Sequence, residues 1–286
     1  MSYGPPPAGP LPEPTLIPTQ GWHCAHLYYQ FDRAALHQLS GDAGARCRAA
    51  FEAALDPAGE AAPTRLQSFL VAGLKADFGL MMLDADPLKI DAVNQRLRSG
   101  ILGTVVVPAY SFVSITEVSE YVPTVEQYAE RLVAEGEAAG SPGYEAKVKG
   151  YAQRLPLMNK QRLTPDLPTW PAMCFYPMNK KRKVGENWFT LPFADRNRMM
   201  AEHAKSGMAF AGKVSQLITV GLGLEDWEWG VTLWARNPEY LAHIVYKMRF
   251  DEASARYAEF GPFYTGFLAS AAAILDHCRI GTGTPG

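Results

Sequence analysis

Two segments of the chain repeat the same plan of hydrophobic and polar positions. In the first, residues 77–83 form an apolar run that predicts a buried strand, a polar turn follows, and Pro87 opens a predicted helix. Residues 226–238 repeat that order, with a strand of alternating apolar and small residues before Pro238. Pro87 and Pro238 lie 151 residues apart, as do the glycines of the two strands. The repeat predicts that both halves of the chain share one architecture.

Flanking elements complete the predicted unit in each half. Apolar runs at 22–29 and 170–178 predict a first strand, and Tyr28 and Tyr176, which lie 148 residues apart, take equivalent places in this alignment. Helical patterns follow, and each half closes on a further strand; these segments are 47–55, 193–204, 111–115 and 263–265. The order strand, helix, strand, strand, helix, strand is that of a ferredoxin-like unit.

The domain organisation follows from this duplication. Residues 1–18 hold seven of the 22 prolines and no basic residue, so we expect a disordered, extended tail. We expect an N-terminal ferredoxin-like domain over 19–143 and a C-terminal one over 144–286. The stretch 135–144 and the polar run 147–165 are predicted to form the connection between them.

Composition narrows the class of protein. Of the 286 residues 48% are apolar and 20% are charged, which is typical of a globular protein. A net charge of −2 argues against a general nucleic-acid binder, and no stretch is apolar for the length of a membrane span. The start lacks the basic and apolar regions of a secretory signal. The four cysteines form no CxxC pair and no zinc-ligand cluster, so we expect a reducing, cytoplasmic location.

Residues with chemical potential gather in the second half. Four consecutive basic residues, 180–183, follow the strand that carries Tyr176. Such a run is either a solvated loop or a strand end that binds a polyanionic ligand. His203 lies on an apolar helix face, where it is either a packed core residue or the imidazole ligand of a haem-like group. Gln216 is predicted to be a strand-edge amide, and the segment 249–261 a salt-bridged connector.

Several of these segments match a known family. The runs 175–182, 187–189, 213–216, 226–233 and 248–263 resemble the chlorite dismutase superfamily. Within it they look like peroxide-dependent coproheme decarboxylases of the branch with a distal glutamine. The resemblance covers about residues 144–270 strongly and the first half loosely. It implies an α+β fold in which duplicated ferredoxin-like units form a dimeric α+β barrel-type subunit.

The resemblance also implies a role for individual residues. His203 would be the axial iron ligand, Gln216 the distal residue, Tyr176 the residue that becomes a radical, and Lys180 a second catalytic group. The residues expected to bind the substrate are Arg162, Tyr176, Pro177, Met178, Asn179, Lys180, Gln216 and Ser254, with Trp188 and Tyr144 as further pocket aromatics. Asn179 and Ala204 depart from the serine and glycine that are common in the family.

The implied reaction converts Fe-coproporphyrin III to haem b by two hydrogen peroxide-dependent decarboxylations, with the tetrapyrrole as both substrate and redox cofactor. The resemblance further implies a homopentamer and a transient contact with coproporphyrin ferrochelatase. Chlorite dismutases proper have an arginine at the place of Gln216 and lack the tyrosine, which disfavours chlorite chemistry. The alternatives are a haem peroxidase or chlorite-degrading enzyme, a non-enzymatic haem carrier, and a structural oligomer.

Overall fold

The computed structural model describes residues 13–280, so most of the expected tail lies outside the described residues. The strands of the first half are β1 (His23–Phe31), β2 (Arg65–Val71), β3 (Phe78–Asp84) and β4 (Val106–Thr116), and its helices are α1 (Arg33–Gln38), α2 (Ala43–Ala54) and α3 (Pro87–Leu97). None of the helices within 13–280 has the length and hydropathy needed to cross a membrane.

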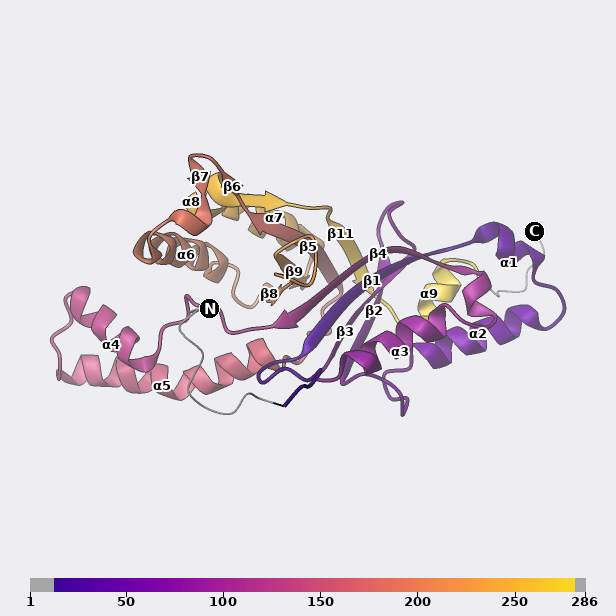
Figure 1. Cartoon of the computed structure of the whole chain (residues 1–286), viewed down its shortest axis with the longest axis horizontal. Coiled ribbons are helices and arrows are strands. Elements are labelled where there is room, and N and C mark those ends of the chain that lie inside the picture. Colours follow the sequence, from indigo (N-terminus) through magenta and orange to yellow (C-terminus); the bar gives the residue numbers. More distant parts are fainter. Residues whose placement is uncertain (1–12, 281–286) are drawn as a thin grey trace.

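A helical hairpin joins the two halves. It consists of α4 (Val125–Ala134) and α5 (Pro142–Leu163), which extend to one side of the sheet (Figure 1). The second half contains β5 (Ala172–Lys180), β6 (Arg182–Lys183), β7 (Glu186–Asn187), α6 (Phe193–Met208), β8 (Val214–Val220), β9 (Trp229–Ala235), α7 (Pro238–Met248), α8 (Glu252–Tyr257), β10 (Ala258–Phe260), β11 (Tyr264–Leu268) and α9 (Ala271–His277).

The large antiparallel sheet closes on itself. Its order β5-β11-β2-β3-β1-β4-β8-β9 returns to β5 because β9 pairs with both β8 and β5. The first half contributes β4-β1-β3-β2 and the second β8-β9-β5-β11, which is the same ferredoxin-like order twice. Pairings of β11 with β2 and of β4 with β8 join the two units. The expected α+β fold with duplicated ferredoxin-like units in one barrel is therefore confirmed.

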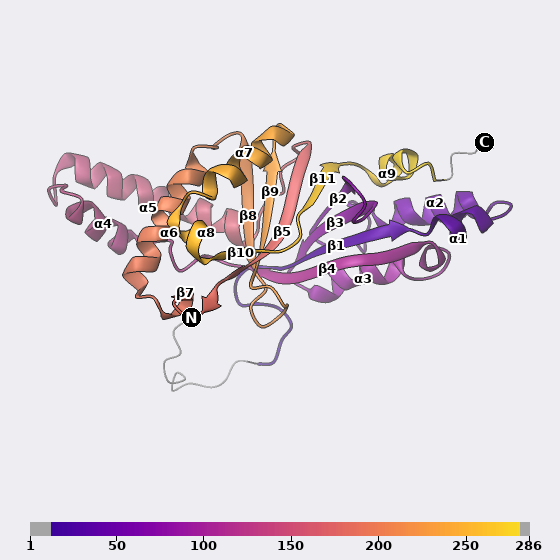
Figure 2. The same ribbon diagram turned by 90° about the horizontal axis from the view of Figure 1, so that it is seen from above.

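Alternation along the strands separates an interior from an outer face. Tyr28, Phe175 and Trp234 come from both halves and pack together inside the barrel. On the outside, α2, α3 and α9 cover the first unit, whereas α7 packs on the second and α6 and α8 lie beside α7 (Figure 2). Each unit thus has a helical layer of its own over a shared core.

The repeat found in the sequence has a structural cause. Helices α3 and α7 begin at the repeated prolines, and the side chains of Asp86 and Asn237 cap them. The repeated glycines, Gly79 and Gly230, lie where a Cβ atom would collide with an interior aromatic ring, that of Phe69 or of Phe112. The alignment of Tyr28 with Tyr176 is wrong, because Tyr28 points into the barrel and Tyr176 lies on the outer face.

Two other segments differ from expectation. The polar run at 147–165 belongs mostly to α5, a 22-residue helix with Pro156 inside it, which starts before the expected boundary at 143/144. The division into domains at that point stays a prediction. The connector at 249–261 contains α8 and β10, and Glu252 pairs there with Arg198 and Arg256, as a salt-bridged segment should.

Candidate haem site

The outer face of the C-terminal unit brings Tyr176 and Gln216 onto the same side of the sheet. Tyr176 lies opposite Val231, which lies opposite Ile218, while Gln216 lies opposite Leu233. Because directly opposite residues share a face, Tyr176 and Gln216 flank β9 on the side that the helices cover. Val231 and Leu233 are buried there under α7, whereas Gln216 and Ile218 are exposed. The helices therefore leave β8 accessible beside a buried tyrosine.

Tyr176 is held among aromatic side chains. Its ring stacks on Phe263 at a centroid distance of 4.4 Å and meets the edge of Phe260. Only 5% of the residue is exposed, and burial raises the pKa of its phenol above the ordinary value. The phenol thus keeps its O–H at neutral pH, as a hydrogen-atom donor requires.

Lys180 ends the same strand, and alternation places it on the face of Tyr176. Its backbone N–H donates to Glu228 Oε2 at 2.8 Å, which fixes the strand end. Its Nζ lies 4.1 Å from the ring centroid of the buried Trp188 and 3.4 Å from Ala253 O. Burial lowers the pKa of Lys180 to about 8, although the carboxylates of Asp251 and Glu228 oppose that change. The ammonium group is therefore poised to gain or lose a proton near neutrality.

His203 on α6 forms a pair with a buried carboxylate. Its Nδ1 lies 2.9 Å from Oδ2 of Asp251, whose side chain is 1% exposed. Burial raises the pKa of Asp251, but hydrogen bonds from His203 and Ser254 outweigh it and hold that pKa below its ordinary value. An ionised carboxylate that accepts the Nδ1 proton leaves Nε2 with its lone pair, as in metal-bound histidines. This donor set fits the iron of a haem-type group.

The expected substrate residues around Tyr176 divide between two faces. Met178 packs with Tyr176 on the outer face. Pro177 and Asn179 lie at the alternate positions, where Pro177 O accepts the N–H of Gly261 and Asn179 Oδ1 accepts the N–H of Glu228 at 2.8 Å. Pro177 and Asn179 therefore hydrogen-bond to the backbone of neighbouring segments. Met178 and Lys180 lie on the same sheet face as Tyr176.

Three other expected residues lie on α8 and α5. Ser254 is 7% exposed, and its Oγ lies 3.4 Å from His203 Nδ1. Arg162 and Tyr144 lie at opposite ends of α5, about 27 Å apart along the helix axis. The carbonyl of Leu163 accepts a hydrogen bond from Thr116 Oγ1 at the end of β4, which fixes the Arg162 end of α5 beside the sheet.

Sequence reasoning missed two residues of this site, Asp251 and Glu228. Asp251 caps α8 by accepting the N–H of Ser254, and aspartate is one of the residues preferred at a helix N-cap. Nothing local ties it to His203, which lies 48 residues earlier. Glu228 is 4% exposed in a loop before β9, where only the tertiary fold brings it to Lys180.

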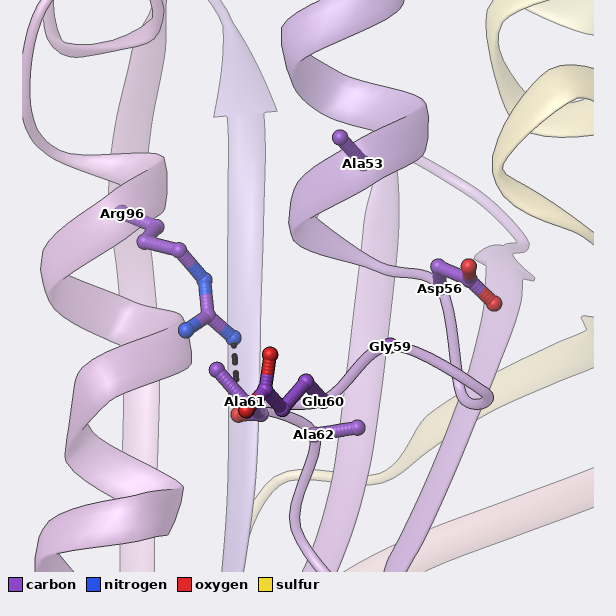
Figure 3. Close-up of a pocket in the computed structure, with 7 residues that line it drawn as sticks. All are labelled: Ala53, Asp56, Gly59, Glu60, Ala61, Ala62 and Arg96. Atoms are coloured by element: carbon purple, nitrogen blue, oxygen red, sulfur yellow. Dashed lines mark hydrogen bonds between the residues drawn. The ribbon is translucent and has the colours of Figure 1, made fainter.

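Elsewhere, a pocket of about 200 Å³ lies on the first unit, where Arg96 donates to Ala61 O at 3.3 Å (Figure 3). Its lining is Ala53, Asp56, Gly59, Glu60, Ala61, Ala62 and Arg96, and none of these residues belongs to the site described above. Across residues 13–280 no three His, Cys, Asp or Glu side chains gather as ligands for a bare metal ion.

A barrel of two ferredoxin-like units with a candidate site on its outer face defines a class of protein, and a comparison with protein families identifies that class. Residues 45–269 match the family model described as chlorite dismutase. The chain belongs to the chlorite dismutase family.

Two solved structures show how far the likeness extends. A haem-binding protein from Thermus thermophilus is 30% identical, with 94% of this chain and 99% of that chain covered and a TM-score of 0.73. A variant of the chlorite dismutase from Candidatus Nitrospira defluvii is 16% identical, with 92% and 97% covered and a TM-score of 0.68. The second likeness is one of fold alone.

Proposed function

We propose that the protein converts Fe-coproporphyrin III to haem b by decarboxylating two propionates, with hydrogen peroxide as oxidant. The observation that carries this proposal is the shared sheet face of the buried Tyr176 and the accessible Gln216. Lys180 ends the tyrosine's strand, and the His203 and Asp251 pair offers an imidazole nitrogen to iron. The haem-binding relative from Thermus thermophilus supports the class of ligand.

Each step is balanced by one molecule of peroxide. One propionate, one hydrogen peroxide and one proton give a vinyl group, carbon dioxide and two molecules of water. The propionate side chain loses two electrons and the peroxide gains them. When bound, the iron porphyrin supplies the centre at which peroxide is reduced.

The residues of this chain divide the remaining work. Tyr176 passes on one oxidising equivalent by giving up its phenolic hydrogen atom and recovering one from the propionate. Lys180 holds a carboxylate as an ammonium group and moves a proton at its Nζ, which its pKa of about 8 permits. Asp251 accepts the Nδ1 proton of His203, which leaves the lone pair of Nε2 free, and Nε2 is the atom that would bind the iron. Gln216 offers an uncharged amide to the peroxide.

The test is a titration of the protein and Fe-coproporphyrin III with hydrogen peroxide, with the porphyrins followed by mass spectrometry. We expect a three-propionate intermediate and then haem b. The absence of both products would overturn the proposal. Oxygen release from chlorite would favour a chlorite-degrading enzyme, whereas tight binding without any peroxide-dependent change would favour a haem carrier.

The same proposal includes the cellular setting. The chain would act in the cytoplasm as a homopentamer and exchange its substrate through transient contact with coproporphyrin ferrochelatase. Gel filtration with light scattering would measure the subunit number directly.

A further inference from the structure

Glu228, in the loop before β9, is a buried carboxylate that is only half paired. The residue is 4% exposed, and its Oε2 accepts the backbone N–H of Lys180 at 2.8 Å. Its Oε1 is buried and has no hydrogen-bond partner among the described residues. Burying a carboxylate with one unpaired oxygen costs more free energy than burying a neutral amide. The charge at this position therefore needs a cause beyond the hydrogen bond to Lys180.

The hydrogen bonds that join this loop to β5 do not need a charge. Asn179 Oδ1 accepts the N–H of Glu228 at 2.8 Å, while Glu228 Oε2 accepts the N–H of Lys180, the next residue of β5. The first of these two contacts uses an amide oxygen, so an amide is sufficient to hold a backbone N–H here. A glutamine at position 228 would make the second contact without a buried charge. The negative charge therefore points to a neighbouring cation.

Two cations lie near Glu228. Arg182 Nη1 is 3.6 Å from Oε1, but the Arg182 side chain is 63% exposed, so water screens much of this attraction. The other cation is Lys180. Its Nζ lies 4.1 Å from the ring centroid of the buried Trp188 and 3.4 Å from Ala253 O, so it has little contact with water on these sides. The less screened cation is the one on which a buried charge acts more strongly.

The charge of Lys180 depends on its neighbours. Burial lowers the pKa of Lys180 to about 8, and the carboxylates of Asp251 and Glu228 oppose that change. Asp251 already accepts hydrogen bonds from His203 and Ser254, whereas Oε1 of Glu228 accepts none within the described part of the chain. The charged or titratable groups around Lys180 are Asp251 with its partner His203, Glu228 with Arg182, and Tyr176 on the same strand face.

We infer that Glu228 is a positioning residue for Lys180. One carboxylate oxygen fixes the end of β5, and the negative charge keeps the ammonium group protonated. Glu228 acts through Lys180 and makes no contact with the porphyrin itself. The inference rests on the proposed function only for the use to which the ammonium group is put.

The experiment follows the protonation of Lys180 in the protein without porphyrin, by NMR of lysine isotopically labelled at Cε. Lys180→Arg identifies the signal, because this variant lacks it. We expect Glu228→Gln to raise the ratio of neutral to protonated Lys180 at a given pH at least about threefold, since glutamine keeps an acceptor but has no charge. Glu225→Gln is the matched control, because Glu225 lies in the same loop and accepts the N–H of Val113 at 2.9 Å. It should leave the ratio unchanged.

Asn179→Ala separates charge from geometry. It removes the amide that holds the backbone of Glu228 and leaves the carboxylate, so the protonation of Lys180 should change less than in Glu228→Gln. In binding titrations with metal-free coproporphyrin III, the pH above which affinity declines should fall in Glu228→Gln by as much as the NMR midpoint does. A structural role alone would move neither midpoint.

Three results would overturn the inference. They are an unchanged or more protonated Lys180 in Glu228→Gln, an equal change in Asn179→Ala, and an equal change in the Glu225→Gln control. The NMR titration needs neither porphyrin nor peroxide, so its outcome does not depend on the proposed function. If Lys180 titrates as described and peroxide yields no decarboxylation, the inference stands and only the proposed function fails.

Discussion

The two ferredoxin-like units use the same sheet face in opposite ways. In the 151-residue repeat, Val231 corresponds to Leu80. Tyr176 lies opposite Val231 and Leu27 lies opposite Leu80, so Tyr176 corresponds to Leu27. On the strand at the other edge of β9 and of β3, Gln216 and Ile218 correspond to Leu66 and Ser68 in the same way. The C-terminal unit thus has phenol and amide groups where the N-terminal unit has two leucines.

The helical layers complete this difference. In the first unit, α9 places Ile274 and Leu275 in the core with no exposed surface, and Ser68 donates to Ala269 O just before that helix. Helix α2 adds the buried Cys47 and Phe51. In the second unit α6 buries Met199 and carries His203 half-buried beside Asp251. A duplicated fold can therefore cover the sheet face of one unit with packed apolar side chains, which stabilise the protein, and leave the same face of the other unit accessible to a ligand.

The sharpest way to break this comparison is Tyr176→Phe. Phenylalanine keeps the stacking on Phe263 but has no hydrogen atom to give, so decarboxylation should fall by at least about a thousandfold while the substrate still binds. Tyr28→Phe is the matched control, since it removes the hydroxyl of a buried tyrosine inside the barrel. Single-turnover assays with peroxide measure both variants. Full turnover by Tyr176→Phe would show that Tyr176 does not act as a radical in the reaction.

A smaller effect is expected when the partner of His203 is changed. Asp251→Asn keeps the size of the side chain but removes the negative charge, so affinity for Fe-coproporphyrin III should fall about ten- to a hundredfold. Metal-free coproporphyrin III should bind unchanged, because under the proposed function His203 would act on the porphyrin only by binding its iron. Absorption titrations with both porphyrins compare the two affinities. An equal loss for both would show that Asp251 supports the fold rather than the ligand.

The pH dependence tests Lys180. If its ammonium group holds a carboxylate, affinity should decline above a pH of about 8 by at most about tenfold per pH unit, since one proton is involved. Lys180→Arg should move that decline to a much higher pH. Protein stability should show the opposite trend. The folded lysine loses its proton near pH 8 and the unfolded one near 10.5, so the free energy of unfolding should rise between these values.

The sequence predicted the fold well because duplication leaves local signals. Prolines at the first turn, capping residues and alternation all act within a few residues, and α3 and α7 follow them. The helix α5 was missed because its polar sequence contains Pro156 and buries only Tyr151, so hydrophobic periodicity is weak. The tyrosine alignment failed by one residue, and in a strand a shift of one residue reverses the face.

The site was predicted as single residues and not as an arrangement. Tyr176, Lys180, His203 and Gln216 were identified from resemblance, and their roles stay predictions. Asp251 and Glu228 act through contacts to residues 48 positions away along the chain, at His203 and Lys180. Long-range contacts and burial are the information that local patterns lack.

The smallest expected effects come from exchanging the counterparts Gln216 and Leu66. Gln216→Leu should change the free energy of unfolding by less than about 0.5 kcal/mol, because this position is exposed. It should slow the reaction with peroxide several-fold, since leucine offers no amide. Leu66→Gln should destabilise the fold by about 1–3 kcal/mol, because it places an amide against the N-terminal core, and should leave porphyrin binding unchanged. Denaturant unfolding and stopped-flow absorption measure the two effects. Equal destabilisation by both changes would mean that the two sheet faces are equally well packed at these positions.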